Sequence, residues 1–186
     1  MTANEWIGGL MEITTAHTAE IDPAVLAAAR RLCDDAFDGE FSDDDWDHAL
    51  GGVHALVWED GELVGHGSVV QRRLLAGGRA LRTGYVEAVA VRADRRGRGH
   101  GAAVMTALEG VLRRAYEVGA LGAAEDAVDF YAARGWVPWR GPTSVLGPDG
   151  PVRTADDDGG LFVLPVTAAP DLDGPIACDW RGGDVW

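Results

Sequence analysis

The stretch VEAVAVRADRRGRGHGAAVMTALE, residues 86–109, decides the fold of this 186-residue chain. It begins as a β-rich run, passes through the glycine-rich segment RGRGHG at residues 96–101, and continues with apolar residues at helical spacing as far as Tyr116. Backbone N–H groups of such a loop can surround a phosphate, and the following helix N-terminus adds positive potential. The stretch therefore predicts a strand, an anion-binding loop and a helix.

The loop does not fit two common nucleotide-binding motifs. It has no Gly-Lys-Ser/Thr of a P-loop, and GRGHGA lacks the GxGxxG spacing of a dinucleotide fold. Glycine also ends strands and caps helices, so the glycines alone leave a purely structural role open. The setting between strand and helix, together with Arg96 and Arg98, favours the anion site.

The segments on either side predict one α/β domain with a hairpin at its centre. Helical spacing and capping residues, and then turn residues between β-rich runs, predict these elements: helices at 23–33 and from Ser42 or Asp43 to 51–52, strands at 53–58, 62–75 and 81–91, a helix at 99–116, a strand at 120–123, a helix at 126–134 and a strand at 161–166. Alternation within 81–91 predicts that Tyr85, Glu87, Val89 and Val91 share one face.

Charge points to a cationic substrate rather than to nucleic acid. The sequence has 16 basic and 30 acidic residues, for a formal net charge of -14. Acidic runs at 43–45 and 156–158 contrast with the arginines of 92–98. A solvated surface also explains an acidic run. Two acidic runs and one basic loop nevertheless indicate two substrates, one an anion and the other a cation.

Other residue patterns limit the class of protein. Cys33 and Cys178 lie far apart in the sequence and do not have CxxC spacing. Two isolated cysteines are typical of free thiols in the cytoplasm. The five histidines show no metal-binding spacing, no GxSxG occurs, and neither a signal peptide nor a membrane span is indicated. We expect residues 1–10 to be a disordered leader and 11–186 to be a single domain.

Two motifs carry a resemblance to a known superfamily. The stretch 86–109 resembles the cofactor motif of the GNAT N-acetyltransferases, (Gln/Arg)-x-x-Gly-x-(Gly/Ala), filled here by Arg96, Gly99 and Gly101, and FYAARGW at 130–136 resembles their second motif. The resemblance implies a mixed α/β fold, with a mostly antiparallel twisted sheet, a splayed parallel strand pair and flanking helices. It also implies acetyl-CoA as co-substrate, contacted by Val89, Ala90, Val91, Arg96, Gly97, Arg98, Gly99, His100 and Gly101.

Amide formation needs a base for the amine, a polarised thioester carbonyl and an acid for the thiolate. Glu87 is the candidate base, acting through a water, because its predicted face continues towards the loop. Tyr131 is the candidate acid, since a phenol with an ordinary pKa of about 10 is protonated at neutral pH. The resemblance also implies that the Val89 N–H donates a hydrogen bond to the thioester carbonyl. An exposed strand glutamate and a core tyrosine are the alternative readings.

Longer matches narrow the resemblance. The segments 37–58, 84–97, 130–151, 153–159 and 178–186 are similar to actinobacterial aminoglycoside 2'-N-acetyltransferases, which are resistance enzymes and often dimers. The resemblance implies an acceptor cleft of Glu40, Asp45, Glu87, Ala88, Gly122, Asp156, Asp157, Asp184 and the terminal carboxylate of Trp186. Several carboxylates around one rigid polycation would fix its orientation.

The sequence departs from that pattern at three positions. Glu40 stands where aspartate is usual, Ala88 replaces a glycine, and Gly122 replaces a serine. These changes affect the acceptor range more than the reaction. Transfer to a cell-wall amino sugar or to a small amino-glycoside metabolite is the alternative, and a non-catalytic acyl-CoA sensor is a third reading that Glu87 and Tyr131 disfavour.

Overall fold

The computed structural model describes residues 11–186, so the predicted leader at 1–10 lies outside the described residues. The chain divides into two compact units, Met1–Ser68 with Glu87–Glu109 and Val69–Val86 with Gly110–Trp186. Two long strands and one long helix contribute residues to both. Each unit is described by itself, and the single domain expected for 11–186 stays a prediction.

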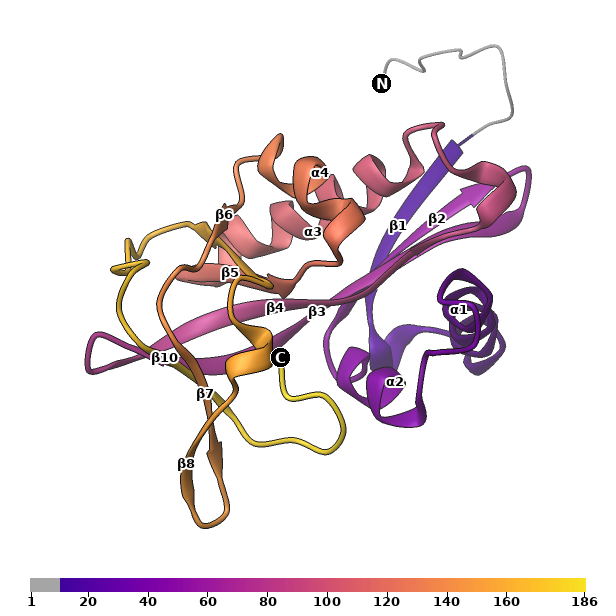
Figure 1. Ribbon diagram of the computed structural model, residues 1–186. Coiled ribbons are helices and arrows are strands. Elements are labelled where there is room, and N and C mark those ends of the chain that lie inside the picture. Colours follow the sequence, from indigo (N-terminus) through magenta and orange to yellow (C-terminus); the bar gives the residue numbers. More distant parts are fainter. Residues whose placement is uncertain (1–10) are drawn as a thin grey trace. The chain divides into compact units, whose positions relative to one another are not determined.

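The first unit contains the N-terminal elements and the stretch that carries the glycine-rich loop (Figure 1). Its elements are β1 (Met11–His17), η1 (Thr18–Glu20), α1 (Pro23–Ala36), α2 (Asp43–Ala49), β2 (Val53–Glu59), the first part of β3 (Glu62–Ala76), the last part of β4 (Arg79–Val91), η2 (Ala93–Arg95) and the first part of α3 (His100–Ala115). Strand β2 lies between β1 and β3, and it pairs antiparallel with β1 from Met11↔Glu59 to His17↔Val53.

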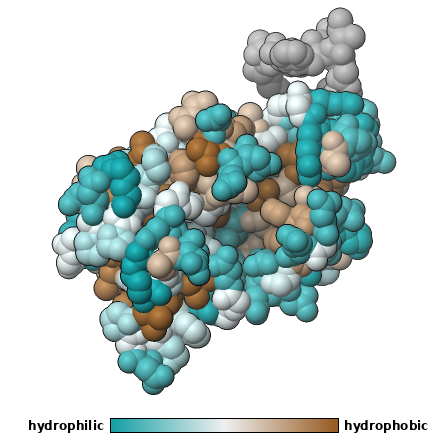
Figure 2. All heavy atoms as spheres, in the orientation of Figure 1, coloured by the Kyte–Doolittle hydropathy of each residue, from teal (hydrophilic) through white to brown (hydrophobic). Residues whose placement is uncertain are grey.

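Local capping explains where both N-terminal helices begin. The Asp22 side chain accepts from the Ala24 N–H at 2.7 Å, and Pro23 occupies the first turn of α1. Ser42 and Asp45 form a capping box at the start of α2. The predicted helix starts are therefore confirmed, although α1 continues to Ala36, beyond the predicted end. Hydrophilic side chains cover the outer surface of these two helices (Figure 2).

Two contacts hold the first unit together. Leu32, Cys33 and Ala90 form a buried cluster that joins α1 to the end of β4. Helix α3 packs on β3 at Gly67, where an added Cβ would lie 2.7 Å from Val104 Cγ1. Glycine at this position therefore permits the close approach that buries the predicted apolar stripe of α3.

The second unit contains most of the sheet. It holds the remaining parts of β3, β4 and α3 and the elements β5 (Val118–Gly122), η3 (Glu125–Ala127), α4 (Val128–Ala132), β6 (Val137–Pro138), β7 (Thr143–Gly147), β8 (Gly150–Arg153), η4 (Ala155–Asp157), β9 (Leu161–Pro165) and β10 (Ile176–Asp179). The strand order is β6-β9-β5-β4-β3-β10-β7-β8. Strands β4 and β5 are parallel, paired from Thr83↔Val118 to Tyr85↔Ala120, whereas β9 is antiparallel to β5. Strands β10 and β7 form a second parallel pair.

Several elements differ from the sequence expectations. The helix predicted at 126–134 is a 3-10 turn, η3, followed by the five-residue α4. The sequence did not predict β1, β7, β8 or β10. Strand β1 is exposed along almost its whole length, so no buried face imposes alternation on its sequence. Strands β8 and β10 have four residues each, too few for a recognisable pattern.

Candidate functional site

The glycine-rich loop ends at a helix N-terminus in the first unit. Gly97 and Gly99 have φ values of 74° and 90°, which side chains rarely adopt. The Ala103 N–H donates to the Gly99 carbonyl at 2.9 Å, so the N–H groups of His100, Gly101 and Ala102 precede the helical hydrogen-bond ladder. A Cβ at Gly97 or Gly99 would meet nothing within 4 Å. An open, N–H-rich loop of this kind fits a pyrophosphate.

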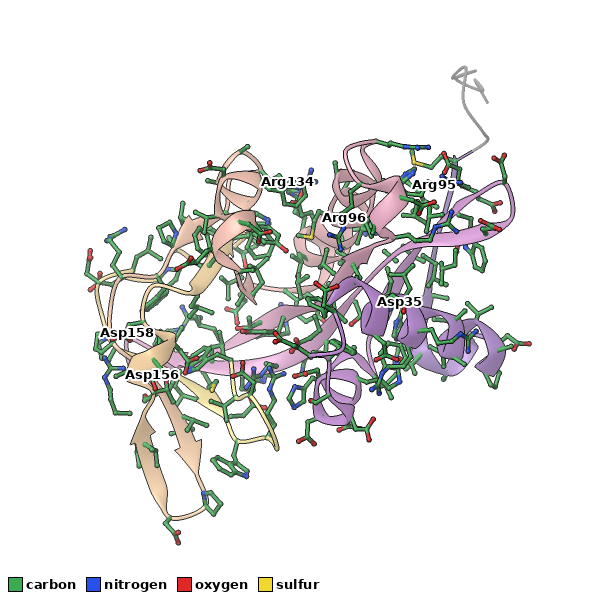
Figure 3. The ribbon with its side chains drawn as sticks, turned by 45° about the vertical axis from the view of Figure 1, so that its right-hand side comes forward. Asp35, Arg95, Arg96, Arg134, Asp156 and Asp158 are labelled. Atoms are coloured by element: carbon green, nitrogen blue, oxygen red, sulfur yellow. The ribbon has the colours of Figure 1, made fainter. Side chains whose placement is uncertain are left out.

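Arg96 and Arg98 differ in what their side chains do. The Arg96 guanidinium donates to the carbonyls of Val91 at 3.2 Å and Ala36 at 3.1 Å, which ties the loop to the ends of β4 and α1 (Figure 3). Arg98 is exposed, and no ion pair is recorded for it within residues 11–186. The Arg96 guanidinium is therefore used to hold the loop, whereas the Arg98 side chain is exposed to solvent.

The other two arginines of the basic cluster are neutralised by acidic partners. Arg92 pairs with Glu62 and with Asp94, each at 2.7 Å, and Arg95 pairs with Glu59 at 2.6 Å. The Arg92 guanidinium lowers the pKa of both Asp94 and Glu62. The sequence therefore overstated the positive charge near the loop, because two of the partners, Glu59 and Glu62, come from β2 and β3.

Strand β4 contains a strained residue. Ala88 has a φ of 51°, a left-handed conformation that costs an L-residue roughly 1–2 kcal/mol. A left-handed residue inside a strand is typical of a β-bulge, which re-aims neighbouring side chains and is frequent beside active sites. Strain of this kind persists only where surrounding contacts hold it.

The side-chain alternation of β4 changes across this residue. In the second unit, a Cβ at Gly84 would point at Leu112 and Tyr116, of which Leu112 belongs to α3. In the first unit, Val89 lies with Val104 of α3 against Gly67. Positions 84 and 89 are an odd number apart, so a regular strand would place them on opposite faces. The prediction that Tyr85, Glu87, Val89 and Val91 share one face is therefore wrong.

The two candidate catalytic residues have different surroundings. Glu87 is half-buried beside the strained residue in the first unit. Tyr131 is buried in α4 of the second unit, with its ring centroid 5.2 Å from that of Phe130 and 6.2 Å from that of Trp136. Burial, and then the charge of Asp126, raises the pKa of Tyr131 to about 12. The phenol consequently stays protonated at neutral pH.

In the second unit, the structure brings together four of the predicted acceptor residues. Trp186 N–H donates to Asp184 Oδ1 at 3.2 Å, and an added Cβ at Gly122 would lie 3.9 Å from the Trp186 carbonyl carbon. Burial, and then the charge of Asp184, raises the pKa of Asp157. Gly122, Asp157, Asp184 and Trp186 thus form one acidic group, with exposed Asp156 in the same turn of η4 (Figure 3).

Asp158 follows directly in sequence but has another role. Its carboxylate forms an ion pair with Arg153 and accepts from the N–H and the hydroxyl of Thr143, each at 3.0 Å. The Arg153 guanidinium lowers the pKa of Asp158 to about 2. The run 156–158 therefore contains one structural carboxylate and two that carry no such ion pair within residues 11–186.

Sequence reasoning missed two arginines in the second unit. The Arg72 and Arg181 guanidiniums lie 4.8 Å and 5.5 Å from the centre of the Tyr85 ring. Arg72 is buried and pairs with Asp179 at 2.8 Å, while Arg181 donates to the main-chain oxygens of Asp184 at 2.9 Å and Trp186 at 3.2 Å. Arg181 thus holds the last segment in place, and only the folded chain shows it.

The remaining predicted acceptor residues belong to the first unit. Glu40 is exposed after α1. Asp45 Oδ2 accepts from the N–H and the hydroxyl of Ser42, each at 2.8 Å, so part of its hydrogen-bonding capacity serves the capping box. The predicted set is therefore divided: Glu40, Asp45, Glu87 and Ala88 lie in the first unit, and Gly122, Asp156, Asp157, Asp184 and Trp186 in the second.

Residues 11–186 contain neither a metal-binding cluster nor a membrane-spanning helix. No group of three or more His, Cys, Asp or Glu residues there could hold a metal ion. No helix in the same part of the chain is long and apolar enough to cross a membrane. Cys33 and Cys178 are buried free thiols, and burial raises their pKa values to about 12 and about 11. Neither thiol is therefore set up as a nucleophile.

The loop, the strained strand and the mixed sheet agree with a comparison to known families. The model of the acetyltransferase (GNAT) family matches residues 18–136, and the chain belongs to this family. The protein is thus an acyltransferase that uses acetyl-CoA as acetyl donor.

By sequence the chain is similar to an aminoglycoside 2'-N-acetyltransferase of Mycolicibacterium fortuitum, 55% identical over 184 residues, which cover 96% of this chain and 94% of the relative.

Solved structures agree on the fold. A GNAT family acetyltransferase from Brucella melitensis in complex with acetyl-CoA covers 94% of this chain and 97% of its own, with a TM-score of 0.62 and 16% identity. Escherichia coli ElaA covers 83% and 99%, with a TM-score of 0.59 and 21% identity. These likenesses confirm the predicted mixed α/β fold.

Proposed function

We propose that this acetyltransferase transfers the acetyl group of acetyl-CoA to the 2'-amino group of aminoglycosides. The observation that carries the proposal is the 55% identity, over 96% of the chain, to an aminoglycoside 2'-N-acetyltransferase. The acidic group of the second unit supports it, because it matches the chemistry of a substrate with several ammonium groups.

The donor side of the reaction is supported by the first unit. Acetyl-CoA supplies an acetyl group activated as a thioester. The N–H groups at the start of α3 would bind the pyrophosphate, with Arg96 holding the loop and Arg98 adding charge. Val89, Ala90 and Val91 would lie along the thioester arm, and the Val89 N–H would donate to the thioester oxygen as negative charge develops there.

The chemical step then needs only two proton transfers from this chain. The amine nitrogen attacks the thioester carbon, so that a C–N bond forms as the C–S bond breaks. Glu87, through a water, would take the proton that the nitrogen loses. Tyr131 would give its phenolic proton to the departing thiolate, and its raised pKa keeps that proton in place until the thiolate forms.

The acceptor side is supported by unbalanced negative charge. In the free protein, burial and then repulsion between Asp157 and the Asp184 carboxylate raise the pKa of Asp157. An ammonium bound between them would remove that repulsion and gain charge-assisted hydrogen bonds. Asp156, Gly122 and Trp186 would complete the contacts in the second unit, with Glu40, Asp45, Glu87 and Ala88 contributing from the first.

We also propose a cytoplasmic homodimer.

A matched pair of substrates tests the proposal. The protein is incubated with acetyl-CoA and with aminoglycosides that differ only in a 2'-amino or a 2'-hydroxyl group. Thiol release is followed, and mass spectrometry locates the acetyl group. We expect release with the 2'-amine alone. Absence of release with every aminoglycoside, or acetylation at another nitrogen, contradicts the proposal; turnover of a simple amino sugar instead favours a metabolic substrate.

A further inference from the structure

A chain of hydrogen bonds runs through the buried part of the first unit and ends at the strained residue of β4. Thr18 Oγ1 lies 2.8 Å from His54 Nε2, and His54 Nδ1 lies 2.9 Å from His66 Nε2. His66 Nδ1 in turn lies 2.9 Å from the carbonyl oxygen of Ala88. Both imidazoles are fully buried. The chain therefore connects the start of η1 to the strained backbone beside Glu87.

The chain has one direction. A carbonyl oxygen can only accept, so His66 Nδ1 carries a proton and its Nε2 is an acceptor. His54 must then donate from Nδ1, and its Nε2 accepts from the Thr18 hydroxyl, for which it is a nearer acceptor, at 2.8 Å, than the Gly52 carbonyl at 3.3 Å; the Thr18 oxygen accepts from the Gly51 N–H at 2.9 Å. Burial lowers the pKa of each histidine to about 4, so both are neutral at pH 7. Every donor thus points towards Ala88.

The last bond of the chain controls a second group. The Ala88 carbonyl and the Val89 N–H belong to the same planar trans peptide, in which C=O and N–H point in opposite directions. A donor that holds the carbonyl therefore also determines where the N–H points. Bonds in such a chain polarise one another, which makes the Val89 N–H a stronger donor.

Packing alone does not account for two histidines here. The Trp46 ring lies 6.5 Å from the His54 ring and 5.7 Å from the His66 ring, and Cys33 Sγ lies 3.7 Å from His66 Nδ1. Aromatic hydrocarbon side chains would fill this space without burying four polar nitrogens. Beyond packing, the hydrogen bonds fix the orientation of the peptide that joins Ala88 to Val89.

We propose that His66, oriented by His54, is a positioning residue for acetyl transfer, which fixes the 88–89 peptide so that the Val89 N–H points at the thioester oxygen. The inference rests on the proposed role of Val89 in the donor site. It does not depend on which amine is the acceptor.

An NMR experiment on the full chain tests the inference without any acceptor. The Val89 amide proton is followed on addition of acetyl-CoA or of CoA, which lacks the thioester oxygen. We expect a downfield shift with acetyl-CoA only in the unmodified protein. His66→Phe should lose that shift, whereas His66→Asn, with an amide N–H near the position of Nδ1, should keep most of it. His54→Leu should give an intermediate shift.

Kinetics with the preferred amine provide the second measurement. His66→Phe should lower kcat by about 10-fold to 100-fold, less than the 10²–10³ for loss of an oxyanion donor, with the KM for acetyl-CoA nearly unchanged. Leu32→Val is the matched control. It weakens the buried cluster of Leu32, Cys33 and Ala90, against which Ala88 packs, and it changes no residue of the hydrogen-bond chain.

Two results with the variants would overturn the inference. One is a folded His66→Phe or His54→Leu protein that keeps both the Val89 shift and kcat. The other is a Leu32→Val protein that loses as much kcat as His66→Phe, since the effect would then be general to the cluster. A missing acetyl-CoA shift in the unmodified protein would remove Val89 as donor, and the inference with it. Aminoglycoside turnover tests the proposed function separately.

Discussion

The donor loop of the first unit and the acidic group of the second are built in opposite ways. The loop consists of six consecutive residues that end at the start of α3, and the Arg96 guanidinium within it is held by carbonyls. The acidic group joins residues from Gly122 to Trp186, and burial, followed by the charge of Asp184, raises the pKa of Asp157 within it. A site formed by backbone N–H groups is thus determined by neighbouring residues in the sequence. A site formed by carboxylates is brought together only by folding, and a bound cation would reduce the repulsion between them.

The largest effect is expected at the candidate catalytic base, Glu87. Glu87→Gln removes the candidate base, so kcat/KM should fall by about 10²–10⁴ and lose its dependence on an ionising carboxylate. Initial rates across the pH range check this, with exposed Glu12→Gln as the control. An unaltered pH profile would eliminate Glu87 as base.

A somewhat smaller effect is expected at the candidate acid. Tyr131→Phe should lower kcat by about 10²-fold, since the thiolate would then leave without a proton donor. Because burial raises the pKa of Tyr131 to about 12, the unmodified enzyme should show no loss of activity from this phenol near pH 10. Tyr116→Phe is the control phenol. Full activity in Tyr131→Phe would leave this tyrosine with a packing role.

A backbone change tests the donor loop. Gly99→Ala should raise the KM for acetyl-CoA by about 10-fold, because a side chain at a φ of 90° forces the loop to shift. Gly61→Ala in the β2–β3 turn has a φ of 81° and equally open surroundings, so it should cost similar stability, about 1 kcal/mol, without altering KM. Equal KM values in the two variants would argue against the loop as the cofactor site.

The smallest and most specific effect concerns charge repulsion in the acidic group. The folded pKa of Asp157 is raised, so its ionised form disfavours folding, and this penalty grows as pH rises through that pKa. Asp157→Asn should therefore raise the Tm of the free protein at pH 7 while increasing the KM for the aminoglycoside severalfold.

Asp158 provides a control of opposite sign. Its pKa is lowered to about 2 by Arg153, so its stabilising contribution is present at neutral pH and is lost as pH falls through that value. Asp158→Asn should lower the Tm at pH 7. A lower Tm in both variants would show that the ionised Asp157 carboxylate does not destabilise the folded protein.

The sequence predicted elements with strong local signals and failed where partners are distant. Asp22 with Pro23, and Ser42 with Asp45, mark helix starts because a cap and its N–H groups are within three residues. Exposed β1 had no buried face to shape its sequence. Of the arginines near the loop, Arg92 and Arg95 could not be told from Arg96 and Arg98, because their acidic partners include Glu59 and Glu62 on other strands.

The sequence by itself therefore determined the loop, the helix that follows it and the family, since glycine placement and helical spacing act over neighbouring residues. Only the tertiary structure decided the left-handed φ of Ala88, its bond to His66, and which carboxylates repel and which are paired. These depend on groups far apart in the chain, whose distances and burial exist only in the folded protein, and burial and distance are what set a charge's pKa and a peptide's direction.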